Sequence, residues 1–115
     1  MLLSDERIKK IIDYDFNDEE AYKKLNELQV ARFNYKNSNN KNNSIGLIAQ
    51  QVKKVIEEAV DINTSTYVTK DGEMDIMDLH SVDYTTIISY IISSIKHTSK
   101  KIQELEIKIN SKIQK

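Results

Sequence analysis

The chain has 115 residues, and its 17 basic and 18 acidic residues leave a net charge of −1, which predicts no binding to nucleic acid or to an anionic membrane. It has no cysteine, which excludes disulfides, thiolate zinc sites and a cysteine nucleophile, and no apolar stretch long enough to span a bilayer. With no proline and only two glycines, it allows long helices and cannot form a glycine-rich nucleotide loop. We expect one α+β domain, mainly helical, over residues 1–115.

The first predicted element is a short helix over residues 4–12. It would place Ile8, Ile11 and Ile12 on one apolar face. Ser4 is a favoured N-cap residue for such a helix, but it also stands five residues before Lys9, and a neutral lysine can activate a serine hydroxyl. Helical residues five apart point about 140° apart, so the two side chains can meet only if Ser4 lies outside the helix. The stretch alone leaves the cap and the nucleophile open.

A second helix is predicted over residues 18–29. Asn17 is a good N-cap, and Glu20 three residues later completes a capping-box pattern. The apolar positions of this helix predict one buried face, formed by Tyr22, Leu25 and Leu28.

A β-hairpin and a third helix come next. Residues 30–36 and 45–49 are β-prone, and the polar, asparagine-rich residues 37–44 between them predict an exposed loop. Gly46 inside the second strand suggests a bulge or a close approach of another chain segment. Residues 49–60 have helical apolar spacing, carried by Val52, Val55, Ile56 and Ala59.

A second hairpin is predicted over residues 66–76, with Asp71 and Gly72 forming a tight two-residue turn. Ser81 or Asp83 is then placed to cap the last helix. His80 lies near aspartates but has too few potential ligands around it for a metal site, and His97 is expected to face solvent. We expect no cofactor and no metal.

The last helix is predicted over residues 83–115, about 50 Å long at ~1.5 Å per residue, which is too long to pack on a domain of this size. It carries a heptad pattern with isoleucine at position a and mostly isoleucine or leucine at position d, a combination that favours trimers or larger assemblies over dimers. We therefore expect a head over residues 4–82 and a trimerisation helix over residues 83–115; the alternative is a long amphipathic helix packed within one subunit. The predicted trimer interface comprises Ile88, Ile91, Ile95, Ile102, Leu105 and Ile109.

Five short motifs occur in one order along the chain: "SDERIK", "FNYK", "IGLIAQQV", "EEAV" and "SVDYTTII". In this order and spacing the chain resembles the endosialidase-type C-terminal intramolecular chaperone domain, which ends phage tail spikes and is also found in the myelin regulatory factor. The resemblance runs from Ser4 to about Leu105.

The resemblance implies a homotrimer that assists the assembly of an upstream fibre or spike-type trimer and then releases itself by serine peptidase chemistry. Transferred to this sequence, Ser4 is the nucleophile, Lys9 the general base and Asp5 the motif aspartate, and the scissile bond is Leu3–Ser4. The expected setting is the cytoplasm of the host or producing cell during assembly, with a virion-associated parent protein. The alternatives are a trimerisation module without enzyme activity and a helical adaptor that binds a partner helix along the isoleucine-rich face.

Overall fold

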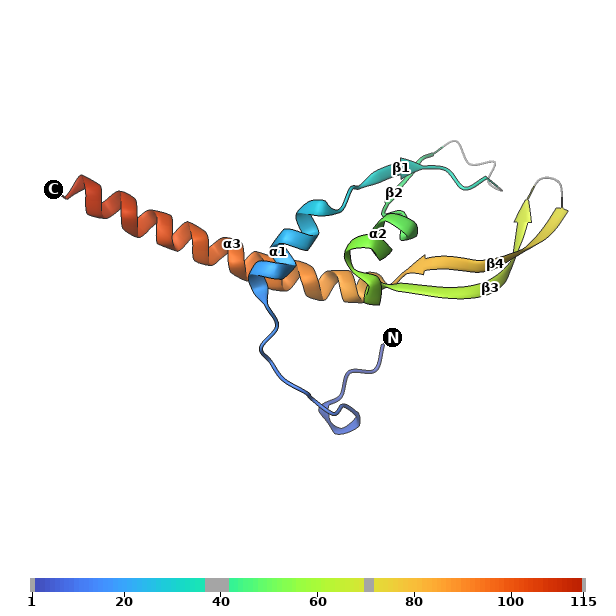
Figure 1. The fold of residues 1–115 in the computed structure, drawn as a ribbon, viewed down its shortest axis with the longest axis horizontal. Coiled ribbons are helices and arrows are strands. Elements are labelled where there is room, and N and C mark those ends of the chain that lie inside the picture. The colour runs from blue at the N-terminus through green and yellow to red at the C-terminus, as the bar shows by residue number, and fades with distance from the viewer. Residues whose placement is uncertain (1, 37–41, 70–71, 115) are drawn as a thin grey trace.

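The computed structural model describes residues 2–36, 42–69 and 72–114 and has the expected α+β class, with two small antiparallel hairpins and a long C-terminal helix in the described ranges (Figure 1). Its extents are 72 × 40 × 25 Å, because the C-terminal helix projects from one end and the hairpins from the other. In chain order the elements are η1 (Glu6–Ile8), α1 (Asp18–Glu27), β1 (Ala31–Phe33), β2 (Ser44–Gly46), α2 (Ala49–Val55), η2 (Glu57–Ala59), β3 (Val60–Thr69), β4 (Gly72–Val82) and α3 (Tyr84–Ile113).

Helix α3 confirms the predicted long C-terminal helix. Asp83 is its N-cap, and its carboxylate accepts hydrogen bonds from the backbone N–H of Thr85 at 3.0 Å and of Thr86 at 3.4 Å. Ser81, the other predicted cap, lies in β4. The helix has 30 residues, and no helix in the described part of the chain is both long and apolar enough to cross a membrane.

Helix α1 packs along α3, and its predicted cap is confirmed. The Asn17 side chain accepts a hydrogen bond from the backbone N–H of Glu20 at 3.0 Å. The predicted buried face is partly wrong: Ala21 is fully buried and Tyr22 is 39% exposed, whereas Leu25 and Leu28 are half-buried against the core. The Tyr22 ring lies at the side of the helix pair, against the ring of His97 in α3.

The first hairpin pairs β1 with β2, with Arg32 opposite Ile45, and is shorter than predicted. Residues 37–41 of the predicted loop lie outside the described residues. The predicted close approach at Gly46 is confirmed, because a Cβ atom at this position would lie 2.8 Å from the Tyr84 hydroxyl oxygen. That hydroxyl accepts a hydrogen bond from the backbone N–H of Leu47 at 3.0 Å, which attaches the hairpin to the start of α3.

The predicted helix over 49–60 is too long. Helix α2 ends at Val55, Ile56 leaves the helical region with a φ of −131°, and the short turn η2 follows. Ile56 and Ala59 are fully buried, so the same apolar spacing is satisfied by a change of chain direction that inserts both side chains into the core.

The second hairpin is longer than predicted, because β3 begins directly after η2. Val60 pairs with Val82 at one end, and Thr69 pairs with Gly72 at the other. Gly72 is therefore the first residue of β4 and not part of a two-residue turn; Asp71, the other residue of the predicted turn, lies outside the described residues. The φ of +118° at Gly72 is a backbone conformation that residues with side chains rarely adopt.

The hydrophobic core lies where α1, α2, η2 and α3 meet, and it is small. Its buried members are Ala21, Val52, Ile56, Ala59, Ile87 and Tyr90. Only the first part of α3 contributes to it, so most of the apolar surface of this helix is left in solvent.

The predicted helix over residues 4–12 is wrong. Only the single turn η1 forms, and Ile8, Ile11 and Ile12 are 64%, 49% and 91% exposed. Residues 2–15, here called the N-terminal arm, hang away from the body (Figure 1). Since a short helix gains its stability mainly from packing, an apolar face with nothing to pack on does not hold a longer one.

Candidate functional site

The turn η1 sets the positions of the two residues predicted to carry chemistry. Asp5 is its N-cap, and the Asp5 carboxylate accepts a hydrogen bond from the backbone N–H of Arg7 at 2.8 Å. The turn closes with backbone bonds from Ile8 to Asp5 and from Lys9 to Glu6, at 3.1 and 3.3 Å. The expectation that Ser4 could be the cap is therefore wrong: Ser4 precedes the cap, and Lys9 follows the turn in an extended conformation.

The structure brings Ser4 and Lys9 together. The Lys9 Nζ atom donates a hydrogen bond to the Ser4 Oγ atom at 2.5 Å. Ser4 lies outside the helical turn, as the sequence prediction required for this contact. A continuous helix would have pointed the two side chains about 140° apart, whereas the short turn brings its flanking residues together. A lysine in contact with a serine hydroxyl has the geometry of a base for that hydroxyl, provided that the amine is neutral.

Solvent surrounds this pair in the single chain. Ser4, Lys9 and their neighbours along the arm are all exposed, and the predicted cleavage-site residue Leu3 is 77% exposed. The Leu3–Ser4 peptide is therefore accessible in the single chain.

Arg7 and Asp5 form a second set of contacts across the same turn. The Arg7 guanidinium donates from Nη2 to Asp5 Oδ2 at 2.8 Å and from Nε to Oδ1 and Oδ2 at 3.1 and 3.2 Å. These bonds from the Arg7 side chain, with the one from its backbone N–H, hold the pKa of Asp5 below its ordinary value, and Asp5 raises the pKa of Arg7. Sequence reasoning missed Arg7; the available signal was that only two of the 17 basic residues are arginines.

A protein-family model matches the first half of the chain. The family model described as chaperone of endosialidase matches residues 4–61, about half of the chain. The chain belongs to the chaperone of endosialidase family. No curated protein matches the chain.

Membership of the chaperone of endosialidase family confirms the resemblance seen in the sequence. It supports a role as an intramolecular chaperone, and the name of the family model is that of a peptidase-related domain. The matched residues begin at Ser4 and end at Asp61, so they include the Ser4–Lys9 pair and the first hairpin but not α3.

The predicted trimer interface lies along one exposed stripe of α3 in this member of the chaperone of endosialidase family. Its six residues are 41–58% exposed. At ~100° per residue, this stripe is centred about 100° around the helix from the face that packs on the core, where Ile87, Tyr90, Ser93 and Ser94 are buried. The alternative of a helix packed entirely within one subunit therefore leaves the stripe uncovered. The stripe consists of Ile88, Ile91, Ile95, Ile102, Leu105 and Ile109.

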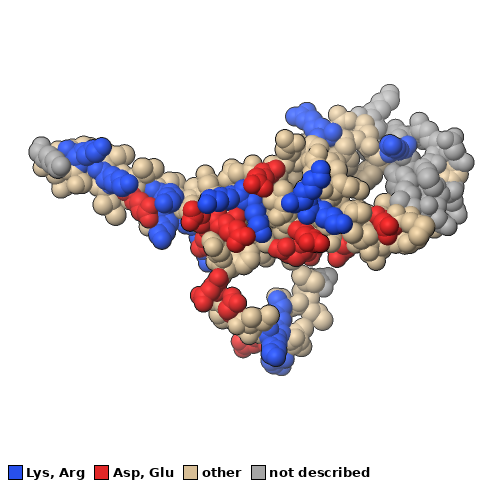
Figure 2. Space-filling model, in the orientation of Figure 1, with Lys and Arg blue, Asp and Glu red and all other residues tan. Residues whose placement is uncertain are grey.

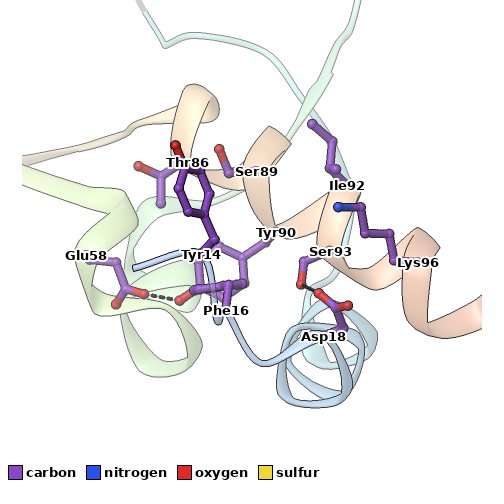
Figure 3. A pocket seen from close by; sticks show the side chains of 10 residues that line it. All are labelled: Tyr14, Phe16, Asp18, Glu58, Thr86, Ser89, Tyr90, Ile92, Ser93 and Lys96. Atoms are coloured by element: carbon purple, nitrogen blue, oxygen red, sulfur yellow. Dashed lines mark hydrogen bonds between the residues drawn. The ribbon is translucent and has the colours of Figure 1, made fainter. Parts of the chain in front are cut away.

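The arm joins the body at a hollow of about 450 Å³ beside α3 (Figure 3). Phe16 packs edge-on against the Tyr90 ring, with ring centroids 4.9 Å apart. The Tyr90 hydroxyl donates to the Glu58 carboxylate, and the Ser93 hydroxyl donates to the Asp18 carboxylate. Both carboxylates already accept a hydrogen bond from α3, so the hollow is a structural junction that ties η2 and α1 to this helix.

The Tyr90–Glu58 bond changes the titration of both groups. Burial raises the pKa of Tyr90 well above its ordinary value, and the hydrogen bond to Glu58 and the charges of Glu58 and Glu20 add to the rise. The pKa of Glu58 is lowered, chiefly by the Tyr90 hydroxyl, with a smaller effect from the charge of Lys24. A neutral tyrosine facing an ionised glutamate is therefore the stable pairing at neutral pH.

The two histidines do not form a site. His97, predicted to face solvent, is half-buried and lies against the Tyr22 ring, with centroids 4.9 Å apart. The His80 Nδ1 atom lies 2.6 Å from the backbone carbonyl oxygen of Asp78. Within the described ranges, no group of three or more histidine, aspartate or glutamate side chains is placed to hold a metal ion.

Proposed function

We propose that this chain is an intramolecular chaperone that trimerises through α3 and cuts itself from an upstream polypeptide at the Leu3–Ser4 bond. The observation that carries the proposal is the 2.5 Å contact between Lys9 Nζ and Ser4 Oγ, at the residue where the family match begins. Ser4 is the nucleophile, Lys9 the general base, and Asp5 the cap of the turn between them.

The reaction is an acyl transfer followed by hydrolysis. Neutral Lys9 takes the proton of the Ser4 hydroxyl while Oγ attacks the carbonyl carbon of Leu3. The Leu3–Ser4 C–N bond then breaks, and the Lys9 ammonium returns the proton to the departing Ser4 amine. Water hydrolyses the ester between Leu3 and Ser4 Oγ, leaving a Leu3 carboxylate on the upstream chain and a regenerated Ser4 hydroxyl.

Assembly would switch this reaction on. A lysine in water is mostly charged near neutral pH, and a charged amine cannot accept the serine proton. A neighbouring subunit that covers the arm would desolvate Lys9, and desolvation lowers the pKa of a lysine. The exposed isoleucines of the arm and of α3 supply apolar surface for such contacts.

The upstream client would lie at the hairpin end of the molecule. Both hairpins extend away from the C-terminus of α3 (Figure 1). We propose that the polar connection over residues 37–44 reaches toward the client during assembly in the cytoplasm of the producing cell, and that the finished parent protein becomes part of a virion. Protection of this connection from protease in an uncleaved fusion, and loss of that protection on release, is the expected result.

The mass of a fusion tests the cleavage. With the native upstream segment attached before Met1, the wild-type trimer should split at Leu3–Ser4, whereas Ser4→Ala and Lys9→Ala should stay full length and still form trimers. Lys10→Ala is the matched control: Lys10 is also an exposed lysine of the arm, but in the described structure Ser4 bonds to Lys9 and not to Lys10, so this variant should cleave like wild type. A wild-type trimer that stays full length would refute the peptidase proposal.

The second candidate function is a trimerisation module without enzyme activity. The exposed stripe of α3 favours it independently of Ser4 and Lys9. Full-length wild-type fusion in a trimer would support this candidate. A monomer in sedimentation experiments would refute both trimer proposals and favour an adaptor that binds a partner helix.

A further inference from the structure

The Asp5–Arg7 contact is the most highly connected side-chain pair on the N-terminal arm. Arg7 donates four hydrogen bonds to the Asp5 carboxylate, three from its guanidinium and one from its backbone N–H. Two backbone hydrogen bonds, from Ile8 to Asp5 and from Lys9 to Glu6, close the turn. A planar guanidinium binds the two carboxylate oxygens through parallel N–H···O bonds, whereas a lysine ammonium lacks this fixed geometry.

These bonds lie in the segment that joins Ser4 to Lys9. Asp5 follows Ser4 directly and caps the turn, Arg7 is the middle residue of the turn, and Lys9 ends it. Closing the turn therefore fixes the chain direction on both sides, and this is what places Lys9 Nζ against Ser4 Oγ.

Arg7 also determines which charged side chains can form an ion pair with Lys9. The other charged groups within four residues of Lys9 are Asp5, Glu6, Arg7, Lys10 and Asp13, and this part of the arm is exposed along its length (Figure 2). Lys9 has no ion pair in the described part of the chain, whereas both Asp5 oxygens are engaged by Arg7. Without Arg7, an unpaired carboxylate would stand next to Ser4 and compete with its hydroxyl for the Lys9 ammonium.

We propose that Arg7 is a positioning residue for the self-cleavage site. By binding both oxygens of the Asp5 carboxylate, its guanidinium closes the turn that joins Ser4 to Lys9 and prevents Asp5 from forming an ion pair with Lys9. The inference rests on the proposed function and adds to it a residue that touches neither the scissile bond nor the nucleophile. Its chemical consequence follows from simple electrostatics. A free carboxylate near an amine favours the charged form of that amine, and a charged Lys9 cannot take the serine proton.

The experiment compares cleavage rates of the fusion as a function of pH. Arg7→Ala should slow cleavage about tenfold at neutral pH. The pH at which the cleavage rate increases should be about one pH unit higher than in wild type, which is the size of the shift that a nearby opposite charge causes in the pKa of an amine. Arg7→Lys keeps the charge but not the fork, and should also be slower than wild type. The double variant Asp5→Asn/Arg7→Ala should return the pH profile toward that of wild type, because asparagine caps a turn but carries no charge.

The matched control is Arg32→Ala, which removes the other arginine from an exposed position of β1 and should leave the rate and the pH profile unchanged. A slower Arg7→Ala variant with the wild-type pH profile would overturn the inference, since a merely structural role would produce that result. So would an Arg7→Ala variant that cleaves at the wild-type rate.

A second measurement does not depend on cleavage. Selective carbon labelling of lysine lets the ionisation of Lys9 be followed by NMR in the trimer of the Ser4→Ala variant, with Lys9→Arg used for assignment. The titration midpoint of Lys9 should be higher when Arg7 is also replaced by alanine, and an unchanged midpoint would overturn the inference. If the wild-type fusion is not cleaved while the midpoint shifts as expected, the proposed function fails and the electrostatic role of Arg7 stands.

Discussion

The hydrogen bond between Tyr90 and Glu58 should stabilise the fold by a measurable amount. Tyr90 is 5% exposed in the core and Glu58 lies on the solvent side of η2. Tyr90→Phe removes the hydroxyl but keeps the ring, so its packing against Phe16 remains. Hydrogen bonds to charged groups contribute about 1.5–3 kcal/mol, and the freed Glu58 carboxylate can be hydrated by water. We therefore expect Tyr90→Phe to lower the free energy of unfolding by about 1.5 kcal/mol, the lower end of this range.

This loss should depend on pH in a direction fixed by the two pKa shifts. The pKa of Glu58 is lowered below its ordinary value of 4.5, so its contribution to stability is present above that value and is lost as pH falls through the folded-state pKa. The pKa of Tyr90 is raised above its ordinary value of 10.0, so its contribution is present below that value and is lost as pH rises beyond it. The difference in stability between the wild type and Tyr90→Phe should therefore be largest between these two pH limits.

Thermal unfolding followed by circular dichroism measures the difference. Since about 1 kcal/mol corresponds to a shift of about 4 °C in a domain of this size, Tyr90→Phe should melt about 6 °C below wild type at neutral pH. The proteins must be compared at equal concentration, because unfolding of an oligomer depends on mass action. Tyr14→Phe is the matched control, since Tyr14 lines the same hollow but is 86% exposed. Equal melting of Tyr90→Phe and wild type, or a difference that does not change with pH, would refute the reasoning.

Three further substitutions test the core, the stripe and the hairpin contact. Ile56→Ala should cost about 3 kcal/mol in urea unfolding because Ile56 is fully buried, and a cost typical of a surface position would contradict the described core. Ile95→Asp should abolish the trimer, as measured by light scattering, because it places a charge in the predicted interface. Ile107 is exposed but lies off the stripe, so Ile107→Asp should leave the trimer intact. Equal behaviour of the two variants would show that the heptad register is wrong. Gly46→Ala should cost about 1–2 kcal/mol, because its Cβ would displace the Tyr84 hydroxyl, and a smaller cost in a Tyr84→Phe background would identify that contact as the reason.

Local signals in the sequence predicted the capped helices well. Asn17 and Asp83 bind the first backbone N–H groups of α1 and α3, and these contacts depend only on residues two or three positions away. The absence of proline and glycine after Asp83 then lets α3 continue for 30 residues. Such features need no knowledge of the rest of the fold.

The features that sequence reasoning missed depend on what lies opposite a segment. The isoleucines of residues 8–12 have helical spacing, but no surface of the described chain receives them, so the helix does not form. The spacing of Val52, Ile56 and Ala59 fits one helix equally well, yet the chain turns at Ile56 to bury all three. Periodicity reports which residues are apolar and does not report where the chain changes direction.

The candidate site was predictable in part. The family motifs identified Ser4 and Lys9, and the rule that Ser4 must lie outside the helix was derivable from helix geometry alone. The contact between the Asp5 and Arg7 side chains was not, because a bond between side chains two residues apart leaves no periodic pattern. Asp5 is a favoured cap residue, but the neighbouring Ser4 fits that role equally well in the sequence.

The exposed arm and the exposed stripe of α3 together suggest why cleavage would wait for assembly. In one chain Ser4 and Lys9 are already in contact, so under the proposed function assembly has to supply surroundings in which Lys9 can act as a base, and not the contact itself. Burial is the physical change that neutralises a lysine most strongly, and the small core of a single chain offers none to the arm. A second and third copy would add apolar surface along α3, close in space to the point where Phe16 joins the arm to Tyr90. Under the proposed function, coupling proteolysis to oligomerisation would need no separate switch, because the subunit interface itself would supply the desolvation.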